Sequence, residues 1–419
     1  MSQQRSGGMH FPKGFLWGAS TAGHQVEGGL ENQWTRWELE NAKSLAARAP
    51  YRFDYLEQWD EIKQQAADPD NYVSGRGVEH YQRFSDDVQL LRKLHMNSYR
   101  FSIEWSRIEP QPGVWSAESI AHYKARLKTL KDAGITPVVT LLHFTLPTWF
   151  ADMGGFEKYR NIKYFVRYAD KILTELGHDL EWIITINEPT VYATESYYWG
   201  HWPPARTSKR LTFEVLQNLI RAHKKVYRLT KKNPRWKISM AHNVSHYYAG
   251  DTAWLSEVSA KLLNYRDNVY ALRRVRRQSD FIALNYYFSN RVYGYRVHNP
   301  EDRVSDLGWD LQPGDLRYVL EDLQDRYGLP ILITENGLAD AGDTRRQWWL
   351  TETIRAMHES LKKGVKLVGY LHWSLLDNFE WDKGYWPRFG LVAVDRATMK
   401  RTIRPSAQWL GRVIQKLRS

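Results

Sequence analysis

Short apolar runs and longer amphipathic segments alternate along the whole chain. Eight of the short runs are mostly apolar without interruption, which is typical of parallel strands covered on both faces. These predicted strands span residues 15–20, 98–103, 136–142, 182–187, 236–242, 280–286, 330–335 and 365–373. The segments between them show the three-and-four spacing of amphipathic helices, at residues 78–94, 119–133, 163–176, 212–229, 314–327, 344–363 and 406–417.

Eight strands that alternate with helices predict an α/β fold, a single (β/α)8 TIM barrel over residues 1–419, with residues 1–10 flexible. A doubly wound sheet shows the same alternation, but it normally carries a glycine-rich phosphate turn after its first strand. Gly28 and Gly29 come too late in the chain and lack that spacing. No linker rich in Gly, Ser or Pro divides the chain, so one domain is expected.

Aromatic side chains are more frequent than a core requires. The 19 Trp residues carry N–H groups that need partners when buried, so many are expected on a surface that binds sugar rings or nucleic-acid bases. The formal net charge of +12 would suit an acidic partner, but most basic residues are interspersed with acidic ones along the predicted helices. We interpret the dense cluster of Arg273, Arg274, Arg276 and Arg277 as a solvated face.

The chain contains no Cys, which excludes disulfides, thiolate metal sites and a cysteine nucleophile. Residues 1–14 are polar and lack the apolar core of a secretion signal, and no apolar run approaches the length of a membrane span. We therefore expect a soluble cytoplasmic protein that makes no contact with membranes. Its oligomeric state stays open.

Polar residues are concentrated where the predicted strands end, and in barrels of this kind the chemistry gathers at the carboxyl ends of the strands. The polar residues at these ends are Arg100, Glu104, His143, Asn187, Glu188, Asn285, Tyr287, Glu335, Asn336 and His372. Glu188 and Glu335 follow strands four and seven, so we expect them to face each other across the barrel mouth. Two carboxyl groups about 5 Å apart are what a retaining glycosidase requires.

Several motifs, in the same order, resemble those of glycoside hydrolase family 1, whose members are mostly β-glucosidases and β-galactosidases. The motifs are FPKGFLWGAS at 11–20 leading to Gln25, YRFS at 99–102, TINEP at 185–189, ITENG at 333–337 and WSLLDNFEW at 373–381. The similarity covers nearly the whole chain and implies a (β/α)8 barrel with β-glycosidase activity. NQWTRWE at 32–38 and IEWSR at 103–107 are similar to the archaeal-type branch of the family.

The resemblance also implies a role for each matching residue. Glu188 would be the general acid/base and Glu335 the nucleophile, supported by Arg100, Asn285 and Tyr287. The implied substrate-binding residues are Asn187 for the sugar 2-hydroxyl, Gln25, His143, Glu380 and Trp381 for other hydroxyls, Trp373 under the ring, and Trp309 and Phe389 on the aglycone side. No cofactor and no metal ion is implied.

Two departures from the family pattern affect the expected substrate. Family members often carry His-Trp-Asp on strand three, where this chain has His143, Phe144 and Thr145 and so lacks one indole N–H donor to the sugar. The stretch from His242 to Asp280 is also shorter than expected between strands five and six. Because this region helps to shape the aglycone entrance, we predict a more open cleft that tolerates varied or longer aglycones.

The predicted function is hydrolysis of terminal non-reducing β-D-glycosyl residues by double displacement through a covalent glycosyl-enzyme. Small β-glycosides or oligosaccharides are the expected partners, glucose is the expected glycone, and galactose, fucose and mannose stay open. Glu380 and Trp381 argue against a phosphorylated sugar, because a carboxylate would repel phosphate. The alternatives are a non-catalytic carbohydrate-binding barrel and, because of the positive charge, a nucleic-acid binder, although no nucleic acid is expected.

Overall fold

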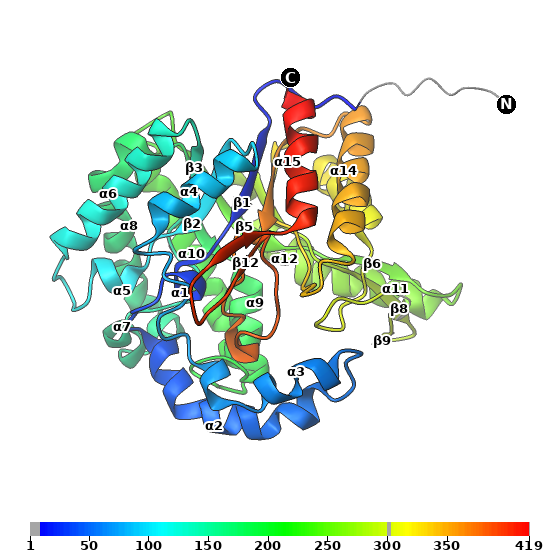
Figure 1. Ribbon diagram of the computed structural model, residues 1–419, viewed down its shortest axis with the longest axis horizontal. Helices are drawn as coiled ribbons and strands as arrows, with labels where there is room; N and C mark the ends of the chain where they lie inside the picture. Colours follow the sequence, from blue (N-terminus) through cyan, green and yellow to red (C-terminus); the bar gives the residue numbers. More distant parts are fainter. Residues whose placement is uncertain (1–8, 300–302, 419) are drawn as a thin grey trace.

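Eight parallel strands close into a barrel in the computed structural model, which describes residues 9–299 and 303–418 (Figure 1). Around the barrel the strands follow the order β1, β11, β10, β7, β5, β4, β3, β2. Their bounds are Leu16–Ser20 for β1, Ser98–Ser102 for β2, Thr136–Thr140 for β3, Trp182–Asn187 for β4, Lys237–Asn243 for β5, Ile282–Asn285 for β7, Ile331–Glu335 for β10 and Leu367–Trp373 for β11. This confirms the predicted (β/α)8 barrel. The expected flexibility of residues 1–10 falls mainly on residues 1–8, which lie outside the described residues.

The barrel closes through β1, which pairs in parallel with both β2 and β11. Ala19 lies opposite Tyr99 on one side and His372 on the other. Only a glycine fits at position 18 of β1, because an added Cβ would lie 2.1 Å from the carbonyl oxygen of Ser98. The missing side chain therefore allows the first two strands to approach closely enough to pair.

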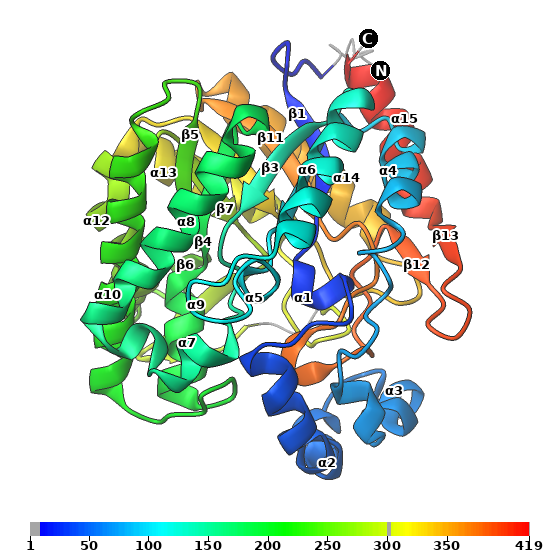
Figure 2. The ribbon, with the colours of Figure 1, turned by 90° about the vertical axis from the view of Figure 1, so that its left-hand side faces the viewer.

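Helices surround the barrel and follow its strands in the chain (Figure 2). They are α4 (Phe84–Lys93), α6 (Ala117–Asp132), α8 (Ile162–Leu176), α10 (Lys209–Thr230), α12 (Tyr270–Val275), α13 (Leu316–Tyr327), α14 (Arg346–Lys362) and α15 (Pro405–Arg418). The helix predicted at 78–94 is too long at its start. The backbone N–H groups of Val78 and His80 both donate to the carbonyl oxygen of Val26, at 3.0 and 3.1 Å, which holds this segment out of the helix.

Several elements beyond the predicted ones lie in the connections. Between β1 and β2 are α2 (Gln33–Phe53) and α3 (Trp59–Ala66), which project beyond the barrel at the bottom of Figures 1 and 2. Between β5 and β10, the strands β6 (His246–Ala249), β8 (Ser289–Tyr293) and β9 (Arg296–Val297) form a small sheet next to α11 (Trp254–Asn264). The remaining elements are short: α1 (Gly23–Val26), α5 (Trp105–Ile108), α7 (Thr148–Asp152), α9 (Pro189–Thr194), the π-helical turns Glu195–Trp199 and Tyr265–Val269, and the hairpin β12 (Val392–Val394) with β13 (Arg401–Ile403).

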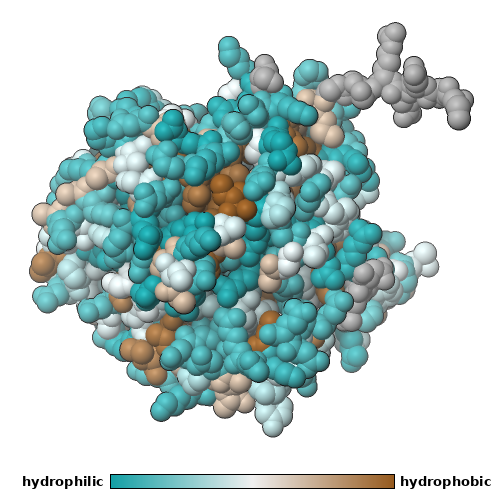
Figure 3. Space-filling view, in the orientation of Figure 1, coloured by the Kyte–Doolittle hydropathy of each residue, from teal (hydrophilic) through white to brown (hydrophobic). Residues whose placement is uncertain are grey.

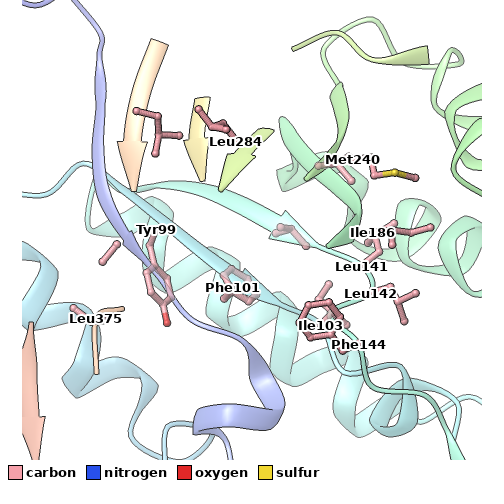
Figure 4. Close-up of a cluster of buried hydrophobic side chains, with 14 of the residues drawn as sticks. Tyr99, Phe101, Ile103, Leu141, Leu142, Phe144, Ile186, Met240, Leu284 and Leu375 are labelled. Carbon is pink, nitrogen blue, oxygen red and sulfur yellow. The ribbon is translucent and has the colours of Figure 1, made fainter. Parts of the chain in front are cut away.

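Two apolar cores hold the barrel together. The larger lies between strands and helices, and Figure 4 shows a part of it around Phe101, Leu141 and Ile186. A separate cluster draws one or two residues from each of seven strands and fills the barrel interior: Leu16, Val138, Trp182, Ile184, Ala241, Ala283, Leu332 and Leu371, with Phe281 beside β7. Because these side chains block the inside of the barrel, a ligand can bind only at its ends. None of the described helices is both long and apolar enough to cross a bilayer.

Candidate active site

A cavity of about 430 Å³ opens at the carboxyl ends of the barrel strands. Eleven of the thirteen residues that sequence analysis selected line it: Gln25, His143, Asn187, Glu188, Tyr287, Trp309, Glu335, Trp373, Glu380, Trp381 and Phe389. The other two, Arg100 and Asn285, are fully buried behind the cavity wall. Arg100 hydrogen-bonds Glu335 as predicted, whereas the amide of Asn285 donates to Glu188 at 2.7 Å rather than to Glu335, because it faces the carboxyl group that follows β4. The predicted residues therefore come together from distant parts of the chain in one cavity.

Glu335 ends strand β10 and is held at both carboxyl oxygens. Arg100, at the middle of β2, forms a buried ion pair with Oε1, and the hydroxyl of Tyr287 donates to Oε2 at 2.6 Å. The same guanidinium donates to Thr140 Oγ1 at 3.0 Å and to Asn187 Oδ1 at 2.7 Å. Both oxygens of Glu335 thus accept hydrogen bonds, which is the pattern of a carboxylate whose position is fixed.

Glu188 directly follows strand β4 and occupies a different environment. Its φ of 40° is in the left-handed region, which only a few non-glycine residues adopt, and Pro189 begins α9 immediately afterwards. The amides of Asn285 and Asn243 donate to its Oε1 at 2.7 and 3.3 Å. Burial, and then the negative charge of Glu335, raise the pKa of Glu188 to about 8. Glu188 is therefore suited to keep a proton up to neutral pH.

His143 stands between two indole rings on one side of the cavity. Its ring is nearly parallel to those of Trp373 (centroids 5.8 Å apart) and Trp381 (6.1 Å). The amide of Asn187 donates to its Nε2 at 3.3 Å, so the ring proton is on Nδ1, a buried atom with no partner among the described residues. Burial lowers the pKa of His143 well below its ordinary value, and the charge of Arg100 lowers it further, so the ring is neutral.

Gln25 and Glu380 form a second polar group on the cavity wall. The amide of Gln25 donates to the Phe379 carbonyl oxygen at 2.8 Å and to Glu380 Oε2 at 3.3 Å. Its own carbonyl oxygen, Oε1, is buried and has no partner in the described part of the chain. Burial raises the pKa of Glu380 to about 7. Buried polar atoms without partners are costly, so these groups are suited to bind a ligand rich in hydroxyls.

Aromatic rings line another side of the cavity. The ring of Trp309 lies 5.7 Å from that of Tyr287 and 6.1 Å from that of Phe389. Phe288 packs on the same indole with centroids 5.4 Å apart. This wall offers flat apolar surface close to the hydroxyl that Tyr287 directs at Glu335.

The departure on strand three has a clear structural result. Phe144 lines the cavity at the position where family members often carry Trp, and it packs against Trp381 and Trp202. Thr145 points elsewhere, because its hydroxyl donates to the buried carboxyl group of Glu104 at 2.8 Å. The cavity therefore has one ring but no N–H donor at this point.

A group of cavity residues that follow β4 and β5 was not predicted from the sequence: Thr190, Val191, Thr194, Glu195, Asn243, Ser245, Tyr247, Arg266, Asp267 and Asn268. Asn243 ends β5, one residue beyond the predicted strand, so the strand-end criterion could have found it. Tyr247 donates to Asp267 at 2.7 Å, and Arg266 forms two hydrogen bonds with the same carboxylate at 2.6 and 2.8 Å. Tyr247 comes from β6, and Arg266 and Asp267 come from the π-helical turn after α11, where no sequence motif marks them.

A larger hollow of about 820 Å³ lies at the opposite end of the barrel. Its two carboxylates, Glu181 and Asp280, are ion-paired with Lys237 and Lys231 at 2.6 and 3.1 Å. Paired surface charges of this kind are ordinary, and the hollow has no polar group buried and unsatisfied in its lining. Nowhere in residues 9–299 and 303–418 do three or more His, Asp or Glu side chains form a group that could hold a metal ion.

A barrel with two buried glutamates at its strand ends defines the class of a glycoside hydrolase. The family model "Glycosyl hydrolase family 1" matches residues 8–266 and 248–418, and the chain belongs to this family. β-Glucosidase A of Acetivibrio thermocellus is 30% identical over 97% of this chain and 98% of its own length. The chain is thus a β-glycosidase, as the resemblance implied.

Solved structures agree with this assignment. The β-glycosidase from Pyrococcus horikoshii superimposes with a TM-score of 0.86 at 30% identity, covering 97% of this chain and 95% of its own. The β-glucosidase from Thermotoga maritima in complex with glucoimidazole reaches 0.84 at 25% identity, covering 98% and 99%. The similarity to an archaeal enzyme is in line with the motifs at 32–38 and 103–107.

Proposed function

We propose that this chain hydrolyses terminal non-reducing β-D-glucosides with retention of configuration, with Glu335 as nucleophile and Glu188 as acid/base. The observation that carries the proposal is the contrast between two buried carboxyl groups in one cavity. Glu335 accepts hydrogen bonds at both oxygens, whereas the pKa of Glu188 is raised to about 8. One group is therefore prepared to attack and the other to donate a proton at neutral pH.

In the first step a carboxylate oxygen of Glu335 forms a bond to the anomeric carbon while the bond to the aglycone oxygen breaks. Glu188 gives its proton to that oxygen, and the aglycone leaves as an alcohol. The negative charge of Glu335 disappears in the ester, so the carboxylate of Glu188 can then take a proton from water. The water oxygen bonds to the anomeric carbon, Glu335 leaves as carboxylate, and the β-anomer is released.

The glycone lies, in this proposal, on the side of Gln25, His143 and Glu380. The proton on His143 Nδ1 and the lone pairs of Gln25 Oε1 have no protein partner in the described chain. Sugar hydroxyls would act as the missing hydrogen-bond partners. Trp373 lies beneath the ring and Asn187 binds the 2-hydroxyl, where a hydrogen bond that strengthens in the transition state accelerates the reaction. Trp309 and Phe389 contact the aglycone.

Replacement of the nucleophile tests the mechanism. Glu335→Ala should lower kcat on nitrophenyl β-glucoside by at least ~10³-fold, because the covalent step is lost. The matched control is Glu181→Ala, which removes a partly exposed glutamate at the other end of the barrel and should leave kcat unchanged. NMR of the wild-type reaction should show the β-anomer first. Near-normal hydrolysis by Glu335→Ala, or an α-anomer as the first product, would refute the mechanism.

The substrate range needs a separate measurement. The relatives named β-glucosidase support glucose as the glycone. We expect the highest kcat/KM on the β-glucoside in a panel of nitrophenyl glucoside, galactoside, fucoside and mannoside. We also expect comparable rates on aryl glucosides and on glucose oligomers, because the short connection after β5 leaves room for longer aglycones. Faster hydrolysis of the galactoside or fucoside would overturn the expected preference for glucose. Strict preference for one small aglycone would overturn the expected tolerance of longer aglycones.

A further inference from the structure

A row of apolar side chains is exposed along helix α11, on the connection that follows β5. Trp254, Val258 and Leu262 recur at spacings of four and so share one side of the helix, with Leu255 next to them. Trp254 is 73% and Leu262 64% exposed. The opposite side of the helix, with Ser256 and Ala260, is buried. The polarity of this amphipathic helix is therefore inverted, because its small residues face the protein and its large apolar ones face outward.

The exposed surface continues onto the hairpin between β8 and β9. Tyr295, at its tip, is 74% exposed, and Val297 is exposed beside it. Gly294 links the hairpin to the helix, because its backbone N–H donates to Ser256 Oγ on α11 at 2.7 Å. Figure 1 shows α11, β8 and β9 projecting together from the right-hand side of the barrel.

Two further aromatic rings extend the surface at the other end of α11. Tyr265 and Phe213 are exposed, and both rings contact that of Tyr270, with centroids 6.4 and 6.2 Å apart. We call the whole set the α11 surface; it consists of Phe213, Trp254, Leu255, Val258, Leu262, Tyr265, Tyr295 and Val297. A contiguous exposed apolar surface of this kind marks an interaction site.

Basic side chains accompany the α11 surface. Lys261 is exposed on the helix itself, Arg296 lies over the ring of Tyr295, and Arg274 lies over the ring of Tyr270 at 3.5 Å from its centroid. The acidic residues of the same region are Glu214, Asp251, Glu257 and Asp267, and Glu214 and Asp267 are paired with Arg210 and Arg266. The whole chain carries a net charge of +12. Aromatic and aliphatic groups next to Lys and Arg match an interface of acyl chains and anionic headgroups.

We propose that the α11 surface docks onto an anionic lipid membrane, with Trp254, Leu262 and Tyr295 inserted at the headgroup level. This would be a peripheral contact, and it differs from the sequence-based expectation that the chain does not meet membranes. A second copy of the chain is the competing occupant. Two molecules that each carry +12 repel one another, whereas an anionic bilayer attracts both, so the charge favours the membrane.

The position of the surface connects docking to the active site. Arg266 and Asp267 follow α11 directly and line the cavity, so the cavity opens beside the α11 surface. A docked enzyme would meet glycosides that are anchored in the bilayer by an apolar aglycone. This consequence rests on the proposed β-glycosidase function, but the docking itself does not.

Co-sedimentation with vesicles tests the docking. The full chain should bind vesicles of phosphatidylcholine mixed with phosphatidylglycerol, and it should bind vesicles of phosphatidylcholine alone much less. The double variant Trp254→Ser/Leu262→Ser should reduce the bound fraction about fivefold or more, since two inserted side chains are lost. The matched control is Leu39→Ser/Tyr51→Ser, which removes two side chains of similar exposure (72% and 87%) from helix α2 and should bind like the wild type.

The double variant Lys261→Gln/Arg296→Gln should reduce binding to the anionic vesicles. The binding that remains should be less sensitive to salt. All variants should hydrolyse soluble nitrophenyl glucoside at the wild-type rate, which separates a failure of docking from a failure of the proposed function. Three results would overturn the proposal: no binding to anionic vesicles, equal loss in the α2 control, or a dimer in light scattering that Trp254→Ser/Leu262→Ser dissociates while vesicles bind nothing.

Discussion

In the proposed mechanism Glu188 must hold a proton to release the aglycone, and its surroundings set the pH above which that proton is lost. Burial and the charge of Glu335 raise its pKa to about 8, so the acid form persists through neutrality and is lost above. We expect kcat/KM to fall about tenfold per pH unit on the alkaline side, with an apparent pKa near 8. The variant Asn243→Ala removes a hydrogen-bond donor that favours the ionised form of Glu188. The pKa of Glu188 should therefore rise, and the alkaline limb of the pH profile should move to higher pH. An alkaline limb that stays in place in Glu188→Gln would contradict the assignment.

The residues at the strand ends could be predicted because each follows a recognisable apolar run. Glu188 directly follows β4 and Glu335 ends β10, and the barrel geometry alone brings them to the same mouth. Their hydrogen bonds could not be predicted from spacing, since the orientation of Arg100 toward both Glu335 and Asn187 depends on the packed interior. Arg266 and Asp267 lie in the π-helical turn between α11 and α12, in a connection between strands whose course is not marked by any strand end.

Helix α2 determines how firmly one wall of the cavity is held. Arg52, in its last turn, forms an ion pair with Asp382 and also donates to the Asp382 carbonyl oxygen at 3.1 Å. Asp382 is buried and accepts further hydrogen bonds from Trp202 at 3.0 Å and Lys383 at 2.8 Å. These cationic partners hold the pKa of Asp382 well below its usual range. The helix thereby fixes the loop that places Glu380 and Trp381 in the cavity wall.

Removal of the ion pair between Arg52 and Asp382 should weaken substrate binding more than it slows the chemical step. In Arg52→Met the buried Asp382 loses a charged partner, and we expect KM for the glucoside to rise about three- to tenfold with a smaller change in kcat. The free energy of unfolding should fall by roughly 1–3 kcal/mol. Arg36→Met on the same helix breaks the exposed pair with Asp152 and should cost less than ~1 kcal/mol with KM unchanged. Equal effects of the two variants on KM and stability would show that the pair of Arg52 and Asp382 does not hold the cavity wall in place.

The elements that escaped prediction share a physical cause. The barrel strands are recognisable because burial on both faces makes most of them largely apolar, and the observed bounds differ from the predicted ones by no more than two residues at any end. Helix α2 is largely polar outside its packed side and contains Pro50, so its periodicity is weak. Its one local signal is the capping box of Asn32 and Thr35. The small sheet of β6, β8 and β9 pairs strands 40 residues apart, and local sequence cannot encode this pairing.

Over the whole molecule the cavity depends on closure of the barrel, since its walls run from Gln25 to Phe389. The face of the molecule in Figure 3 is largely hydrophilic. Many of the positive charges on the surface are paired with carboxylates. A net charge of +12 is thus compatible with a sugar-binding enzyme. The net positive charge attracts anionic surfaces at a distance and does not act through the chemistry of the cavity.

A ligand that fills this cavity should stabilise the entire barrel, because it binds only the closed, native state. The sugar mimic deoxynojirimycin is basic, and its cation would pair with the carboxylate of Glu335. At 100 times its Kd it should add about 2.7 kcal/mol, which for a chain of 419 residues raises Tm by about 3 °C. Differential scanning calorimetry should show this shift in the wild type and in Glu181→Gln. Glu335→Gln, of nearly the same shape but neutral, should lose most of it at the same ligand concentration. A shift that persists undiminished in Glu335→Gln would show that the cation binds elsewhere than beside this carboxylate.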